Sequence, residues 1–375
     1  MKDSSPNKAL AILVNVVAPY RVPIYVAFAK VFDVTLYVGG AESNRLSWEG
    51  LKRELPEHGV SVKPSWGFTL KRKNRFDFRF LHITPGYIVD LIRDRPDAVI
   101  SNEMGFRSMI ALTYGLLFVK PVWIWWGGTL HTERSVSFLK RVLRFGFARC
   151  VRHWISYGQT SSEYLSNIGV SRERILQIQN CVDDDLYRRA VEPALAIVPR
   201  PVLLFVGQLI GRKGIELLLE SAARLQREGH QFSLLIVGGG PQKEFLQHSA
   251  WRLGLQHVLF DGEEQPEEMP AIYRSADSLV FPTLEDVWGL VVSEALWSGI
   301  PVLCSIYAGC AAEIVPTENR FDPLDSASFD HALRRAVLQQ LKPADVSALL
   351  TCTEVADRIT TDIARVLDYE GVTRS

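Results

Sequence analysis

The stretch that decides the fold is LVFPTLEDVWGLVVSEALWSGIPV, residues 279–302. The apolar run Leu279–Phe281 stops at Pro282, which indicates the end of a buried strand. An acidic loop follows, and a helix is expected to begin near Gly289. Gly299 stands where a C-cap glycine belongs, just before another proline. A strand, a loop and a helix in this order predict a parallel α/β sheet.

The start of the expected helix is a candidate anion site, because free N–H groups at a helix N-terminus attract phosphate. Glu294 lies one turn inside the helix, within reach of a sugar hydroxyl. Backbone amides that can bind a phosphate, next to carboxylates that can bind hydroxyls, suit a nucleotide sugar. An ordinary solvated acidic loop is the alternative interpretation. The candidate binding residues around Glu294 are Glu285, Asp286, Val287, Trp288, Gly289 and Leu290.

Length and charge indicate two domains of different character. A chain of 375 residues exceeds one small core. Its formal net charge is zero, but residues 1–190 hold 27 Lys and Arg against 17 Asp and Glu. The remainder holds 15 basic (42 − 27) and 25 acidic (42 − 17) residues. The basic first half therefore predicts a negatively charged partner. Five scattered cysteines without a CxxC pair fit a reducing compartment and no metal site.

The first half begins like a doubly wound sheet. A strand is expected at 10–14, a helix at 24–32 and a second strand at 33–38. The intervening loop lacks GxGxxG, so no dinucleotide cofactor is predicted. Tyr20 and Arg21 in this loop are candidates for contact with an acceptor, with local capping by the arginine as the alternative. His131, in the polar loop after the strand 121–126, is a further candidate, although a lone histidine is more often structural.

Two basic segments in the first half suggest an anionic surface. Residues 41–80 are expected to be irregular, and 71–80 interleave basic residues with phenylalanine. A solvated loop, a nucleic-acid patch and a membrane-surface patch remain open for 71–80. Residues 135–153 predict a long basic amphipathic helix, which either packs with a solvated basic face or docks on an anionic membrane. No nucleic-acid-binding motif accompanies either segment, and no transmembrane helix is predicted.

The second half restarts the strand–loop–helix pattern. The strand 202–206 leads into the glycine-bounded basic loop 207–214, and the helix 215–227 follows. Glycines let the backbone approach a phosphate, and lysine supplies a charge against a diphosphate. A second glycine turn, 238–241, follows the strand 232–237. The candidate residues of these two turns are Gly207, Gln208, Arg212, Lys213 and Gly239.

These motifs, in this order and spacing, resemble the family-4 retaining glycosyltransferases (glycosyl transferases group 1). Asp286 and Glu294, with seven residues between them, match the two carboxylates of the family's acidic signature. The segment 180–183 is similar to the Asn-Gly-Val-Asp that ends the family's first domain. The chain departs from the family pattern at Gln208, where arginine is usual, and at Asp286, where glutamate is usual. It therefore stays open whether Asp286 or Glu285 takes the first acidic role.

The resemblance implies the GT-B fold, with two Rossmann-like domains facing across a cleft. We expect an acceptor domain at 1–190 and a donor domain at 191–355, with a helix at 356–375 packing back on the first. Lys213, Asp286, Glu294 and His131 become the implied catalytic set. The donor is expected to be a UDP- or GDP-linked sugar, used without a metal or cofactor. The departing phosphate would deprotonate the acceptor, so no side-chain base is required.

The implied activity is transfer of a sugar, with retention, to a glycan or lipid-linked glycan in cell-surface polysaccharide synthesis. A cytoplasmic enzyme, peripheral on the inner face of the membrane, fits the basic half, with no nucleic-acid partner. A nucleotide-sugar epimerase and a non-catalytic sugar-binding relative remain alternatives. Glycoside hydrolysis also uses two carboxylates, but Glu294 on a helix beside a diphosphate loop is a binding placement.

Overall fold

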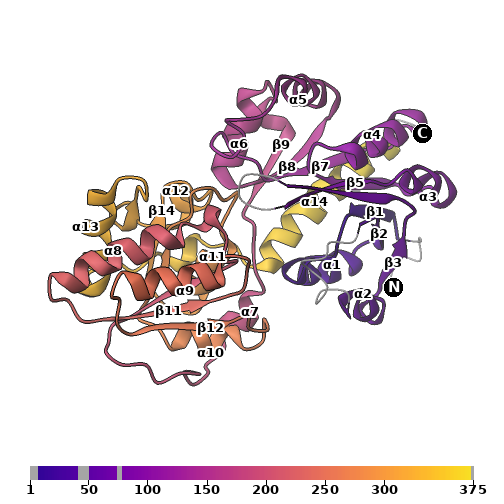
Figure 1. Ribbon diagram of the computed structural model, residues 1–375. Helices are drawn as coiled ribbons and strands as arrows, with labels where there is room; N and C mark the ends of the chain where they lie inside the picture. The colour runs from indigo at the N-terminus through magenta and orange to yellow at the C-terminus, as the bar shows by residue number, and fades with distance from the viewer. Residues whose placement is uncertain (1–6, 41–49, 74–77, 373–375) are drawn as a thin grey trace. The chain divides into compact units, whose positions relative to one another are not determined.

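The computed structural model describes residues 7–40, 50–73 and 78–372, and it divides into two compact units (Figure 1). The first unit comprises residues 1–179 and 350–375, and the second comprises 180–349. The sequence placed the boundary at 190/191, eleven residues later. The boundary lies earlier because the short helix α7 (Asp184–Tyr187) contacts α10 (Met269–Arg274) and α11 (Leu290–Trp297) of the second unit.

The first unit is built on a seven-stranded parallel sheet in the order β3-β2-β1-β6-β7-β8-β9. Its strands are near-continuous apolar runs, as expected where helices cover both faces. The strands are β1 (Ala9–Val14), β2 (Asp33–Val38), β3 (Val60–Pro64), β6 (Ala98–Asn102), β7 (Val122–Trp126), β8 (His153–Tyr157) and β9 (Ile175–Ile178). The helices are α1 (Val22–Ala29), α2 (Leu51–Glu54), α3 (Gly86–Asp94), α4 (Phe106–Phe118), α5 (Phe138–Cys150), α6 (Gly158–Asn167) and α14 (Cys352–Val372).

Four of these helices share one core on the same sheet. Buried side chains of α3, α4, α5 and α6 form a single cluster with β-strand residues such as Ile124 and Trp126. The C-terminal helix α14 belongs to the first unit and packs against α1. There the Trp123 indole N–H donates a hydrogen bond to the Asp362 carboxylate at 2.9 Å. None of the helices in the described residues is long and apolar enough to cross a membrane.

The expectation of an irregular segment at 41–80 is wrong for much of its length. Strands β4 (Phe68–Lys73) and β5 (Phe78–Ile83) form an antiparallel hairpin, and β3 joins the main sheet. Within this segment Phe76, Phe78 and Phe80 recur with the period of a strand, a pattern that we had interpreted as composition alone. Residues 74–77 of the basic segment lie outside the described residues.

The second unit holds a six-stranded parallel sheet in the order β12-β11-β10-β13-β14-β15. The predicted strand at 279–281 and the helix that follows it are both present, so this part of the prediction is confirmed. The strands are β10 (Val202–Val206), β11 (Ser233–Val237), β12 (Val258–Gly262), β13 (Ser278–Phe281), β14 (Val302–Ser305) and β15 (Arg320–Phe321). The helices not yet given are α8 (Ile215–Arg227), α9 (Lys243–Arg252), α12 (Ala311–Ile314) and α13 (Ser326–Val337).

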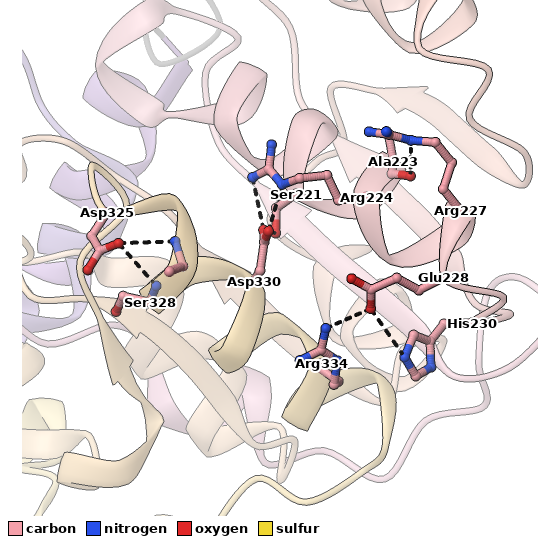
Figure 2. A network of polar contacts seen from close by, with 11 residues as sticks. Ser221, Ala223, Arg224, Arg227, Glu228, His230, Asp325, Ser328, Asp330 and Arg334 are labelled. Carbon is pink, nitrogen blue, oxygen red and sulfur yellow. Dashed lines mark hydrogen bonds and ion pairs between the residues drawn. The ribbon is translucent and has the colours of Figure 1, made fainter.

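A network of hydrogen bonds and ion pairs connects helices α8 and α13 (Figure 2). Asp330 accepts two hydrogen bonds from Arg224, at 2.6 and 2.9 Å, and a third from the Ser221 hydroxyl at 2.6 Å. One turn further along, Arg334 contacts Glu228 at 2.6 Å. Bidentate Arg–carboxylate geometry fixes orientation as well as distance. This network holds the helix that follows the basic loop against the rest of the unit.

Candidate functional site

The second sheet reverses its winding direction between β10 and β13. The chain runs from β10 outward to β11 and β12, and from β13 outward to β14 and β15. In open parallel sheets, ligands bind outside the carboxyl ends of the two strands at such a switch point. The loop 207–214 follows β10 and the acidic loop 282–289 follows β13. Two motifs that lie about 70 residues apart in the sequence (213 and 286) are thereby brought together.

An ion pair joins these two loops. The Lys213 ammonium lies 2.6 Å from the Asp286 carboxylate, with side chains only 12% and 13% exposed. Arg212 Nη1 lies 3.5 Å from the same carboxylate and donates a 2.7 Å hydrogen bond to the Glu285 carbonyl. The backbone N–H of Trp288 donates to the other oxygen of Asp286 at 3.2 Å. Two cations therefore converge on one partly buried carboxylate.

The charge of Asp286 is set by competing effects. Burial would raise the pKa of its carboxyl group, but the charges of Lys213 and Arg212 act in the opposite direction. Hydrogen bonds from Lys213 and from the Trp288 N–H add to the effect of the charges. The pKa of Asp286 lies below its usual value as a result, so the carboxylate is ionised at neutral pH and faces two cations.

Glycines allow the loops to approach closely. Gly214 has φ +70°, and a Cβ there would lie 2.1 Å from the Pro282 carbonyl oxygen. Gly289 has φ +101° and is the N-cap of α11, where a Cβ would lie 2.7 Å from the Phe281 ring. L-residues with side chains rarely adopt these φ values. The two glycines are therefore required where the basic loop meets β13 and where α11 begins.

A third loop, 307–310, binds the acidic loop through backbone hydrogen bonds. Asp286 forms a parallel bridge with Ala308, and the Gly309 N–H donates to the Asp286 carbonyl at 3.1 Å. The Cys310 N–H donates to the Trp288 carbonyl, also at 3.1 Å. The sequence analysis did not anticipate this contact between residues 307–310 and the acidic loop. These backbone bonds fix the start of α11.

Glu294 lies on α11 between two tyrosines. The Tyr273 hydroxyl donates a 2.6 Å hydrogen bond to Glu294 Oε2, and the Tyr187 hydroxyl also bonds this carboxylate. Burial raises the pKa of Glu294, and the two tyrosine hydrogen bonds lower it in part. Burial and the Glu294 charge raise the pKa of both tyrosines above its usual value. The rings of Tyr187 and Tyr273 meet edge to face.

The other predicted residues of the second unit lie on the same loops. Gln208 is exposed in the turn after β10, and Gly207 N–H donates to the Val237 carbonyl at 3.0 Å. The Gly239 carbonyl accepts from the Leu209 N–H at 2.7 Å, which ties the two glycine turns together. Val287 is exposed, and Leu290 is the first residue of α11. Within the described residues, no group of three or more His, Cys, Asp or Glu side chains could hold a metal ion.

Three predicted site residues belong to the first unit. Tyr20 and Arg21 form the 3-10 turn Pro19–Arg21 after β1, and the Arg21 side chain stacks on the Trp125 ring. His131 lies in the loop after β7, and its carbonyl accepts a hydrogen bond from the Arg134 N–H at 3.4 Å. Arg21 is grouped with Tyr20 and with Trp125 of β7 and Tyr157 of β8.

Sequence reasoning missed Tyr187 and Tyr273. They lie 107 and 21 residues before Glu294 (294 − 187 and 294 − 273), in the short helices α7 and α10. Tyr273 lies shortly before the acidic stretch, but nothing in its local sequence indicates a contact with Glu294. Tyr187 follows the family-like segment 180–183, and only the fold shows that it reaches α11.

The comparisons with known proteins bear first on the second unit. Residues 190–348 match the family described as glycosyl transferases group 1. The second unit is a glycosyl transferases group 1 domain. A GDP-mannose-dependent α-(1-6)-phosphatidylinositol monomannoside mannosyltransferase of Mycolicibacterium smegmatis is 30% identical over 188 residues, 48% of this chain and 46% of that protein. A D-inositol 3-phosphate glycosyltransferase of Nocardia farcinica is 33% identical over 159 residues, 39% and 35% of the two chains. The chain thus spans less than half the length of these relatives.

Solved structures resemble the chain over nearly its whole length. Anabaena HepE in complex with UDP and glucose superposes with a TM-score of 0.67 at 16% identity, covering 98% of this chain and 99% of that one. The lipopolysaccharide outer core galactosyltransferase WaaB gives 0.66 at 15% identity, covering 97% and 99%. At such low identity the likeness establishes the fold. The predicted α/β class with two doubly wound parallel sheets, as in GT-B glycosyltransferases, is confirmed.

Proposed function

We propose that this protein is a retaining glycosyltransferase. It would transfer a sugar from a nucleoside diphosphate sugar to a glycan or a lipid-linked glycan of a cell-surface polysaccharide. The observation that carries the proposal is the convergence of Lys213, Arg212 and Asp286 at the switch point of a group 1 domain, with Glu294 on the adjoining helix. Cations suit a diphosphate and carboxylates suit hydroxyls, so together they fit a nucleotide sugar.

The residues divide the work by charge. Lys213 and Arg212 would take the developing negative charge of the leaving diphosphate, helped by the free N–H groups at the start of α11. Asp286 contacts both cations and holds them in place. A diphosphate would compete with Asp286 for these cations, which frees a carboxylate oxygen for a donor-sugar hydroxyl. Retention follows from the family resemblance, with the departing diphosphate oxygen accepting the acceptor's proton.

Glu294 would hold the ribose hydroxyls. Tyr187 and Tyr273 already orient its carboxylate, and their hydroxyls point their protons at it. A carboxylate has about four acceptor positions, so two tyrosine bonds leave room for a diol. Two ribose hydroxyls donating to an ionised Glu294 would also offset the burial that raises its pKa. The tyrosines are positioning residues in this scheme.

The base of the donor is proposed from the relatives. HepE is recorded with UDP and glucose, and the mycobacterial relative is named for GDP-mannose. UDP- and GDP-sugars are therefore the donors to test first. The assay is release of nucleoside diphosphate from a panel of UDP-, GDP- and dTDP-sugars by the full chain, with Glu294→Ala and the exposed Trp251→Ser as controls. Release that needs Glu294 but not Trp251 supports the proposal. No release and no binding of any donor would refute it.

A nucleotide-sugar epimerase of the same fold is the second candidate function. It would use the same diphosphate and ribose contacts, and it would convert the donor without an acceptor. Product analysis from the same panel separates the two, because an epimerase yields an isomeric nucleotide sugar and leaves the diphosphate attached.

We further propose that the protein reaches its lipid-linked acceptor by docking on the inner face of the membrane through α5. This helix buries only Phe147 and Ala148. Its other large apolar side chains are exposed, Phe138 by 81% and Leu139 by 69%, and the rest of this set is Val142, Leu143 and Phe145. An exposed apolar patch rimmed by polar residues is typical of an interaction surface.

The charge around this helix favours an anionic bilayer as the partner. From Phe106 to Arg152 the chain carries one acidic residue, Glu133, and eight basic ones. Each basic side chain near an anionic membrane contributes about 1 kcal/mol of binding. Arg144 is engaged inside the unit, with Glu133 and the Tyr164 hydroxyl. Arg107 is buried against the Asn102 carbonyl, and Lys120 pairs with Asp97. The other basic residues are Arg134, Lys140, Arg141, Arg149 and Arg152.

Sedimentation with liposomes tests this surface. The full chain is expected to pellet with vesicles containing phosphatidylglycerol and to stay in solution with phosphatidylcholine alone. Phe138→Ser with Leu139→Ser should abolish pelleting, and Lys140→Glu with Arg141→Glu should reduce it at least tenfold. Trp251→Ser, which removes an equally exposed aromatic side chain from the second unit, is the matched control. Pelleting by the α5 variants equal to that of the wild type would count against membrane docking.

A further inference from the structure

The first sheet has a switch point of its own, between β1 and β6. The chain passes from β1 to β2 and β3 on one side, and from β6 to β7, β8 and β9 on the other. The general rule for open parallel sheets predicts a ligand outside the carboxyl ends of β1 and β6. Arg21 ends the turn that follows β1, and Asn102 is the last residue of β6. Both therefore lie at this crevice.

Among the residues that the structure describes, Arg21 is a buried cation without an anionic partner. Its side chain and backbone together are 3% exposed. Its guanidinium carbon lies 3.7 Å from the centroid of the Trp125 ring, 5.1 Å from that of Tyr157 and 5.5 Å from that of Tyr20. Within the described residues the guanidinium has no ion pair or hydrogen bond, and Nη1 is fully buried without a partner.

A second unpaired donor lies in the same group. The indole Nε1 of Trp125 is also buried without an acceptor. Buried donors are nearly always paired in folded proteins, so two unpaired donors in one cluster need an explanation. Cation–π contact with aromatic rings offsets part of the burial of Arg21, but it satisfies neither N–H group.

In the part of the chain that the structure describes, no carboxylate contacts Arg21, and the neighbouring Arg107 lies 3.9 Å from the Glu103 carboxylate. Arg107, at the start of α4, donates a 2.8 Å hydrogen bond to the Asn102 carbonyl. Burial raises the pKa of the nearby Tyr25 to about 12, although the charges of Arg21 and Arg107 both lower it. Two guanidinium groups thus act on one phenol. The cluster has an excess of donors and positive charge, which is the complement of an oxyanion.

A polar acceptor completes the group. Asn102 lies beside Trp125 in the register of β6 and β7, and its Oδ1 atom is buried without a donor. A ligand that carries both an oxyanion and a hydroxyl would satisfy all three unpaired groups. A phosphorylated polyol or sugar has this composition. Guanidinium groups match phosphoryl oxygens in geometry and stay charged at every physiological pH.

We propose that Arg21 and Trp125 form a binding site for a phosphoryl group at the switch point of the first sheet, with Asn102 Oδ1 accepting a hydroxyl of the same ligand. The identification of this ligand as the acceptor rests on the proposed glycosyltransferase function, whereas the phosphoryl site does not. The acceptor class would then be a polyol or sugar that carries a phosphate, either free in solution or as the headgroup of a lipid.

Thermal denaturation of the full chain with defined ligands tests the site. The probes are inorganic phosphate, glucose 6-phosphate, glucose, acetate and short-chain phosphatidic acid, all at matched ionic strength. Phosphate and glucose 6-phosphate should raise the transition temperature of the wild type, while glucose and acetate should not. Arg21→Met should weaken the response to phosphate at least tenfold in apparent Kd. Trp125→Phe keeps an aromatic ring at this position and removes the Nε1 donor, so it should weaken the response to phosphate several-fold. A larger response to phosphatidic acid than to glucose 6-phosphate would assign the phosphate to a lipid headgroup.

Controls in the second unit separate this site from the donor site. Lys213→Gln should lose the response to UDP and keep the response to phosphate, and Arg21→Met should do the reverse. If Arg21 serves a ligand, Arg21→Met also keeps or raises the transition temperature without ligand, because it removes an unpaired buried charge. An unchanged phosphate response in Arg21→Met, or a response to acetate equal to that to phosphate, would overturn the proposal. Should Arg21→Met not fold, Arg21→Lys must show the weakened phosphate response.

Discussion

The ion pair between Lys213 and Asp286 permits a quantitative test, because it links two loops through side chains that are almost buried. At 2.6 Å and an effective dielectric constant near 20, the attraction is about 6 kcal/mol before desolvation. Desolvation of both ions removes much of this gain. Loss of one partner of a buried pair nevertheless costs about 3–5 kcal/mol, because the other charge is left uncompensated.

Asp286→Asn leaves Lys213 buried beside Arg212 with no counterion, while the amide oxygen can still accept from the Trp288 N–H. We therefore expect a loss of about 3 kcal/mol in the second unit. That unit contains 170 residues (349 − 179), for which 1 kcal/mol corresponds to about 2–4 °C. Its transition should fall by about 6–12 °C. Lys213→Gln should cost about as much, and the double variant should recover about 2 kcal/mol of the combined loss.

Differential scanning calorimetry provides the measurement, with the transition of the second unit identified as the one that UDP or GDP raises. The pH dependence gives a separate check. Since the pKa of Asp286 is lower in the folded than in the unfolded protein, the pair stabilises the protein above about pH 4 and loses its effect as pH falls through the folded pKa. The difference between wild type and Asp286→Asn should shrink in acid. A coupling energy below about 0.5 kcal/mol at pH 7 would refute this reasoning.

Three further predictions concern single residues. Glu294→Gln should raise the transition temperature without nucleotide at pH 8 but not at pH 4. Burial raises the pKa of Glu294, so the folded protein loses stability as this carboxyl ionises with rising pH, and glutamine removes that loss. Titration calorimetry of the same variant should show at least a tenfold loss of nucleotide affinity, and a gain would contradict the assigned role. Asp330→Ala should destabilise the second unit by about 2 kcal/mol through loss of the Arg224 and Ser221 bonds, against about 0.5 kcal/mol for Glu228→Ala, whose partner is more exposed. Equal losses by calorimetry would argue against the α8–α13 network. Of Glu285→Ala and Asp286→Ala, we expect Asp286→Ala to cause the larger loss of sugar transfer, and the reverse order would give the first acidic role to Glu285.

The local elements of the second unit were predictable from sequence. The apolar run at 279–281 and the glycine at 289 determine only the conformation of residues close to them in the sequence. The strand, the loop and the helix could therefore be predicted in their correct order. The pairing of Lys213 with Asp286 could not be predicted from the local sequence, because it depends on which strands become neighbours in the sheet. The roles of Tyr187 and Tyr273 were invisible for the same reason.

In the first unit, the prediction of an irregular segment at 41–80 rested on composition alone and was wrong for much of its length. Phe76, Phe78 and Phe80 recur with the period of a strand. Residues 68–73 and 78–83 form the hairpin β4–β5 where a loop was expected. The amphipathic helix predicted at 135–153 is present as α5, shorter at both ends. Its sequence gave the pattern, but only the structure shows that most of its apolar side chains stay outside the core. For Arg21, the sequence left ligand contact and local capping open, and the structure places the guanidinium on the Trp125 ring, a contact that the sequence did not indicate.

The central claim is that the switch point of the second sheet binds a nucleoside diphosphate sugar, and a crystal structure of the full chain with UDP or GDP tests it most directly. We predict that the ribose hydroxyls donate to Glu294, with Tyr187 and Tyr273 still in contact with it. The diphosphate should lie against Lys213, Arg212 and the first N–H groups of α11. A nucleotide bound elsewhere, or at this place with Glu294 and Lys213 out of contact, would contradict the account.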